Sequence, residues 1–85
     1  MILEKQNLYI LKLHEAIVVV LSSKPNRTST TEEIANEINK RSLYKKKDNS
    51  VVEASQIKLR TKLSNGAYHH LFEFIEPNIV KLKNQ

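Results

Sequence analysis

The chain contains no cysteine, no tryptophan, one glycine and two prolines among its 85 residues. Without cysteine, neither a disulfide framework nor a thiolate metal site can form, and the chain is compatible with a reducing cytosol. Its longest apolar run, AIVVVL, is six residues long, whereas a membrane span needs roughly 20. The N-terminus also lacks the basic-then-apolar layout of a signal peptide. We therefore expect a cytoplasmic protein that does not enter a membrane.

Motifs for catalysis and metal binding are also missing. The histidines are His14 and the adjacent pair His69-His70, and no carboxylate stands at the spacing of a metal-binding helix. Adjacent histidines point in different directions, so they rarely chelate one ion. We expect neither an enzyme, nor a metal site, nor a cofactor.

The size and composition that remain describe one small packed domain. Hydrophobic residues make up 40% of the chain and charged residues 27%, a balance typical of globular rather than disordered proteins. The length allows a single modest core, and no internal repeat or linker interrupts it. We treat residues 1–85 as one domain, in which residues 1–7 are either a flexible or an interaction arm.

Positive charge is concentrated in the middle of the sequence. Of the net charge of +5, the segment 40–62 contributes +6, from eight cations and two anions, and the rest of the chain contributes −1. Such asymmetry is typical of a surface that meets nucleic acid. For the run Lys45–Lys47, a solvated loop between helices is the alternative interpretation.

Two helices are predicted before this basic segment. An apolar stripe with helical spacing predicts the first: Leu13, Ala16, Ile17, Val20 and Leu21. It ends before Pro25, while its start is open, with Asn7 as a cap or residues 1–11 as an arm. Thr30 followed by Glu33 forms a capping box that starts a second helix, which runs to about Arg41.

The third helix and the hairpin complete the predicted fold. Ser50 and Glu53 have capping-box spacing and predict a helix from about Val52 to Leu63. It has two apolar rows on nearly opposite sides, Val52, Leu59 and Leu63 on one and Ala54, Ile57 and Thr61 on the other. After the Asn65-Gly66 turn, LFEFI and IVKL predict two strands joined by residues 76–78. This order predicts a winged helix-turn-helix: three helices plus a short two- or three-stranded antiparallel wing.

Four pieces of the chain, in order, resemble the HARE-HTH family of winged-helix domains: LHEAI, TTEEIANEINKRSLYKKKDNS, ASQIKLR and YHHLFE. The resemblance covers roughly residues 13–82. It implies a module of the kind found in restriction endonucleases, chromatin-associated regulators and the bacterial RNA polymerase delta subunit, which binds DNA or mediates contacts in DNA-associated machinery. It also implies that Gln56 and Arg60 contact DNA or fix the third helix. One departure is the tip of the hairpin, which carries no Lys or Arg.

The basic segment supplies the candidates for DNA contact. Lys45, Lys46 and Lys47 bring cations to the start of the third helix, where Ser50 and Val51 are expected to approach a phosphate. The candidates to meet base edges are Ser55, Gln56, Lys58, Arg60 and Lys62, of which Lys62 is better placed for the backbone. Arg60 has a second interpretation, in which it lies across the edge of the core and pairs with Glu37 or Glu53.

Two functions follow as hypotheses. The first is a nucleoid-associated module that binds double-stranded DNA with its third helix in the major groove, as the targeting part of a restriction-type enzyme or as a small regulator. The second is a protein-interaction winged helix, which docks on RNA polymerase, a fused enzyme domain or a second copy through Leu8–Leu11, Leu59 and Leu63. The sequence leaves open the oligomeric state, the DNA sequence read and whether these residues belong to a longer protein.

Overall fold

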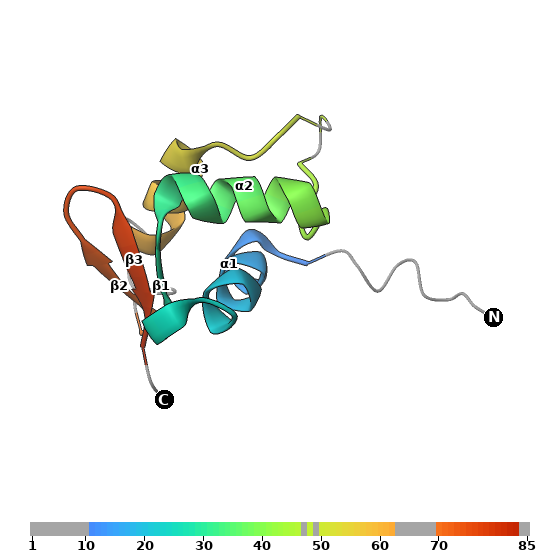
Figure 1. The fold of residues 1–85 in the computed structure, drawn as a ribbon. Helices are drawn as coiled ribbons and strands as arrows, with labels where there is room; N and C mark the ends of the chain where they lie inside the picture. Colours follow the sequence, from blue (N-terminus) through green and yellow to red (C-terminus); the bar gives the residue numbers. More distant parts are fainter. Residues whose placement is uncertain (1–10, 47, 49, 63–69, 84–85) are drawn as a thin grey trace.

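The computed structural model describes residues 11–46, 48, 50–62 and 70–83, and in these ranges it has three α-helices and a three-stranded antiparallel sheet. Figure 1 shows the helices packed together on one side and the sheet standing beside them. This arrangement confirms the predicted fold class, a small helical domain with an antiparallel wing. No helix among the described residues is long and apolar enough to cross a membrane.

Helix α1 (Leu13–Ser22) follows the predicted apolar stripe, and all five residues of that stripe are buried. Its N-cap is Lys12, whose backbone N–H donates to the Glu15 carboxylate over 2.9 Å. Asn7 therefore does not cap this helix, because the N-cap is Lys12 and the helix begins at Leu13. A single 3-10 turn, η2 (Pro25–Arg27), follows α1.

Helix α2 (Thr31–Arg41) begins and ends where its sequence signals place it. The Thr30 hydroxyl accepts from the Glu33 backbone N–H over 3.1 Å, whereas the Glu33 carboxylate pairs with Lys24 over 2.7 Å. At the other end Ser42 has the left-handed φ of 56°, and the next residue, Leu43, donates its N–H to Ile38 over 3.0 Å. This closing pattern satisfies carbonyls that the helix would leave without donors.

Helix α3 (Ala54–Lys62) begins two residues later than predicted, so the prediction of Ser50 as its cap is wrong, while the predicted last residue, Leu63, lies outside the described residues. The reason is Val52, which lies two residues before the helix and whose N–H and carbonyl are both hydrogen-bonded at 2.9 Å to the side-chain amide of Asn39. These bonds fix Val52 in the segment before the helix, and its side chain is buried in the core. The chain can therefore turn into a helix only after this anchor.

The sheet has the order β1-β3-β2. Strands β2 (Phe72–Ile75) and β3 (Ile79–Leu82) form the predicted hairpin. The third strand, β1 (Thr28–Thr30), pairs antiparallel with β3 and leads directly into α2. The Thr31 backbone N–H donates to Asn78 over 2.9 Å, so the start of α2 is also tied to the hairpin.

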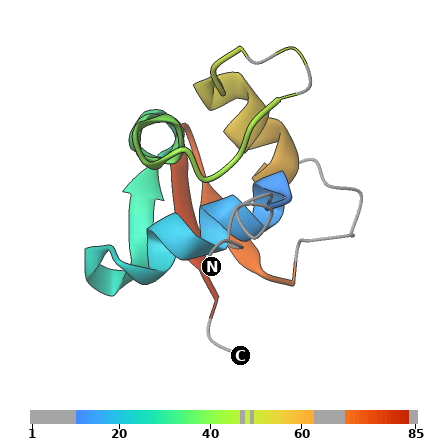
Figure 2. The same ribbon diagram turned by 90° about the vertical axis from the view of Figure 1, so that its right-hand side faces the viewer.

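The core lies where the three helices meet the inner face of the sheet. Figure 2 shows α1 crossing below α2 and α3, with the strands behind it. Leu43 and Tyr44, which follow the end of α2, are half-buried against this core. The largest fully buried side chains are Ile17, Leu21, Ile34, Ile38, Ile57, Val20 and Val80.

Candidate nucleic-acid interface

The described residues between Ser42 and Glu53 form an arch, which leaves the end of α2 and leads to the start of α3 (Figure 1). Lys45 is exposed on this arch and Lys46 is half-buried, while Lys47 lies outside the described residues; Lys40 is exposed on the last turn of α2, before the arch. Arg41 pairs with Glu37 over 2.9 Å, one turn earlier on α2. Lysine side chains are thus exposed on the last turn of α2 and on the arch that follows it.

Ser50 lies on the arch and not at the start of a helix. Its backbone N–H and its hydroxyl both donate to one oxygen of Asp48, over 3.0 and 2.6 Å. These hydrogen bonds hold the pKa of the Asp48 carboxyl below its usual value. Neither Ser50 nor Val51 therefore belongs to the helix N-terminus at which a phosphate was expected.

The inner side of α3 is fixed by Ile57 and Thr61, which are both buried. The Thr61 hydroxyl is 3% exposed and donates to the Ile57 carbonyl over 2.9 Å, so this buried polar group is satisfied within its own helix. Of the two predicted apolar rows, the one that contains Ala54, Ile57 and Thr61 therefore faces the core.

The outer side of α3 carries Ser55 and Leu59, four residues apart and both exposed. Leu59 is 55% exposed, and Val51, just before the helix, is 61% exposed. The predicted row of Val52, Leu59 and Leu63 is not a face of α3: Val52 precedes the helix and Leu63 lies outside the described residues.

Lys58 and Lys62 reach toward the sheet and not directly outward. Their ammonium nitrogens lie 5.9 and 5.4 Å from the centre of the Phe74 ring, which is within the range of cation–π attraction. Lys62 also forms an ion pair with Glu76 in the turn between β2 and β3, which lowers the pKa of that carboxyl. These two lysines therefore join α3 to the hairpin.

Gln56 and Arg60 are both half-buried. The side-chain oxygen of Gln56 accepts from the Glu53 backbone N–H over 3.1 Å, so this side chain closes the first turn of α3. Arg60 lines a small hollow beside α1, together with His14 and Tyr44. This position agrees with the interpretation that Arg60 lies along the edge of the core, while Glu37, one of its two predicted partners, pairs with Arg41.

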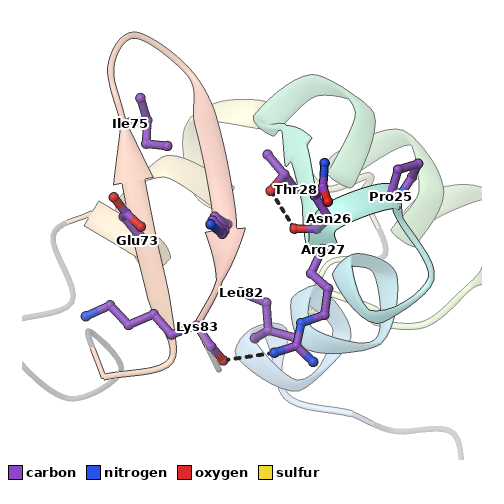
Figure 3. Close-up of a pocket in the computed structure, with 9 residues that line it drawn as sticks. Pro25, Asn26, Arg27, Thr28, Glu73, Ile75, Leu82 and Lys83 are labelled. Atoms are coloured by element: carbon purple, nitrogen blue, oxygen red, sulfur yellow. Dashed lines mark hydrogen bonds between the residues drawn. The ribbon is translucent and has the colours of Figure 1, made fainter. Parts of the chain in front are cut away.

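A second hollow lies over the outer face of the sheet (Figure 3). Glu73, Ile75 and Lys81 come from the strands, and residues 25–28 close one side. The Arg27 guanidinium donates to the Lys83 carbonyl over 3.4 Å. Among the residues that the structure describes, no group of three or more histidines or carboxylates is placed to hold a metal ion.

The structure thus divides the sequence candidates into three groups. Lys45, Ser50 and Ser55 are exposed on the arch and on the outer side of α3, while Lys46, Gln56 and Arg60 are half-buried. Lys58 and Lys62 lie over Phe74. Sequence reasoning named Leu59 as a docking residue for a protein partner but did not place it beside Ser55 among the candidates for DNA contact, although their spacing of four residues places them on one helix face.

Comparison of the chain with family models, curated proteins and solved structures finds no match.

Proposed function

We propose that the protein is a DNA-binding winged-helix module, in which the arch and the outer side of α3 meet the duplex. The observation that carries this proposal is the placement of the positive charge. The segment with a net charge of +6 comprises the end of α2, the arch and α3. Lys40 is exposed on α2 and Lys45 on the arch. Lysines placed in this way can neutralise backbone phosphates and release counterions, the main sequence-independent source of affinity for DNA.

The outer side of α3 would supply base contacts if this helix enters the major groove. Ser55 can donate to or accept from a base edge, and an exposed apolar side chain such as Leu59 can contact the methyl group of thymine. Gln56 and Arg60 are less suited to this role, because the first closes the helix start and the second lines a hollow beside α1. Specificity would therefore come from Ser55 and Leu59.

The wider role rests on the resemblance to HARE-HTH domains. In that setting the chain would act as the targeting part of a restriction-type enzyme or as a small regulator, associated with the nucleoid. The hairpin tip, Glu76-Pro77-Asn78, carries no Lys or Arg, and Lys58 and Lys62 lie over Phe74; both features suggest that the hairpin braces α3 and leaves groove contact to the helix.

Fluorescence anisotropy with labelled duplex DNA tests the proposal. If about five phosphates are neutralised, log K should fall against log salt with a slope of about −4.5. The variant K45A/K46A should bind more weakly, and its slope should be shallower by up to about 1.8, at roughly 0.9 per lost contact. The matched control K81A/K83A removes the same charge from residues that line the outer hollow of the sheet and should bind like the wild type. Absence of binding at low salt, or equal losses in both variants, would overturn the proposal.

A second candidate function, docking on a protein partner, is favoured by the exposure of Val51 and Leu59. Of the other predicted contact residues, Leu11 is half-buried against the core, and Leu8 and Leu63 lie outside the described residues. Because Leu59 is exposed, L59E should leave the domain folded. Sedimentation velocity of wild type and L59E would detect self-association that depends on this side chain, and a monomeric wild type would leave a different protein, such as RNA polymerase, as the partner to test by pull-down.

A further inference from the structure

A hollow of about 200 Å³ lies where α1, α3 and the segment after α2 meet. Figure 2 shows the first turn of α1 next to α3. The hollow is lined by Lys12, Leu13, His14, Tyr44 and Arg60. Three of these residues carry basic groups and a fourth carries a hydroxyl, and they come from three separate parts of the chain. The fold thus brings together donors that the sequence keeps far apart.

The surroundings of His14 show the electrostatic character of this hollow. Burial lowers the pKa of the His14 imidazole, because the charged form loses hydration. Glu15 acts in the opposite direction, while Arg60 and Lys12 lower the pKa further. The carboxylate of Glu15 accepts from the Lys12 backbone N–H, and the described residues that line the hollow include no carboxylate. The described lining thus brings three basic side chains together, with the Glu15 carboxylate near His14 as the opposing charge.

We propose that this hollow binds a phosphate group, held by Arg60, Lys12, His14 and the Tyr44 hydroxyl. A guanidinium presents a planar fork of donors that suits two phosphate oxygens, and an ammonium adds a compact charge. The hollow opens at the first turn of α1, where backbone N–H groups point away from the helix and favour an anion.

The phosphate can come from two sources. One is the DNA backbone, and in this case the inference rests on the proposed function and adds a contact outside the lysines of the arch. The other is free phosphate or a phosphorylated small molecule. Sulfate shares the shape and charge of phosphate but does not titrate near neutral pH, so it serves as the probe in the first experiment.

Binding of an anion here should be coupled to proton uptake by His14. In the unliganded protein the pKa of His14 lies below its usual value of 6.5, so the ring is mainly neutral at pH 7.5. An anion favours the imidazolium and raises this pKa. Affinity should therefore increase as the pH falls through the interval between the raised pKa and the unliganded pKa, and it should level off below the latter.

Proton NMR of the imidazole signals during a pH titration, with sulfate or with chloride at equal ionic strength, tests the inference directly. Sulfate should raise the pKa of His14 relative to its value in chloride. In R60A and Y44F the sulfate effect should shrink, and R60K should restore part of it. An identical His14 titration in sulfate and chloride would overturn the inference. The urea midpoints of the variants establish that each remains folded.

DNA binding by R60A then separates the two sources. If the hollow takes a backbone phosphate, R60A should weaken binding to duplex DNA, and the salt slope should become shallower by about 0.9. If DNA affinity is unchanged but the sulfate effect on His14 is present, the ligand is a free phosphate. If wild type binds no DNA, the proposed function fails, and the sulfate titration still decides whether the hollow binds an anion.

Discussion

Helices α2 and α3 have similar lengths, 11 and 9 residues, yet different interactions set their boundaries. In α2 the cap at Thr30, the acidic first turn, the basic last turn and the left-handed Ser42 all agree with one another. In α3 the apparent cap at Ser50 turns to Asp48, and the helix begins only after Val52 is fixed by Asn39. The boundary of α3 is therefore set by a residue of α2.

This difference has a physical basis. A cap contributes about 1 kcal/mol, so it decides a helix start where no stronger interaction competes. At Val52 two hydrogen bonds and a buried side chain compete with the cap. Together these outweigh a single side-chain cap, because leaving buried backbone groups without partners costs about 1–3 kcal/mol.

The largest predicted difference in the free energy of unfolding is between substitutions on the two opposite sides of α3. I57A removes a fully buried side chain and should reduce the free energy of unfolding by about 3 kcal/mol, because the lost apolar burial leaves a cavity. L59A, two residues on, should change it by less than about 0.5 kcal/mol, since this side chain is largely exposed. Urea unfolding followed by circular dichroism measures both. Similar losses in the two variants would contradict the orientation of α3.

The fold could be predicted to a large extent from the sequence. The stripe of α1, both ends of α2 and the hairpin each follow from residues that lie close together, such as Thr30 with Glu33. Strand β1 did not follow, because the residues Thr28–Thr30 form a strand only by pairing with β3. The start of α3 did not follow either, since Asn39 and Val52 are far apart in sequence.

The candidate site was less predictable for the same reason. The basic segment could be found by counting charges, but the sequence does not show which cations already interact. Lys62 pairs with Glu76, and Arg60 lines a hollow with residues of α1. Spacing alone identifies helix neighbours and not the element that a side chain meets. The exposed surface of Ser55 and Leu59 became clear only once Ile57 was placed in the core.

Substitution of Asn39 tests whether a residue of α2 sets the start of α3. N39A removes both hydrogen bonds to Val52 and leaves two half-buried backbone groups without these partners, so unfolding should become easier by about 2 kcal/mol. N36A is the matched control, because Asn36 lies on the exposed side of the same helix and its removal should change stability by less than about 0.5 kcal/mol. The difference is measured from the midpoints of urea unfolding, provided that the free energy of unfolding depends on urea concentration with the same slope in each variant.

Amide exchange of N39A locates the effect within the molecule. If Asn39 sets the start of α3, protection should fall first at Val52 and in the first turn of α3, while the amides of α2 remain protected. A uniform loss along the chain, or equal destabilisation by N36A, would show that Asn39 contributes to general packing and not to the boundary of α3.

The smallest predicted difference in the free energy of unfolding is between substitutions of the two predicted caps, Thr30 and Ser50. T30A removes the hydroxyl that accepts from the Glu33 N–H and should lower the free energy of unfolding by about 1 kcal/mol. S50A should change it by less than about 0.5 kcal/mol, because Ser50 does not bond to the start of α3. Both residues precede their helices, so helix propensity does not enter the comparison. An equal loss in S50A would mean that Ser50 stabilises α3 after all, and that the anchor at Val52 is not sufficient to fix where this helix begins.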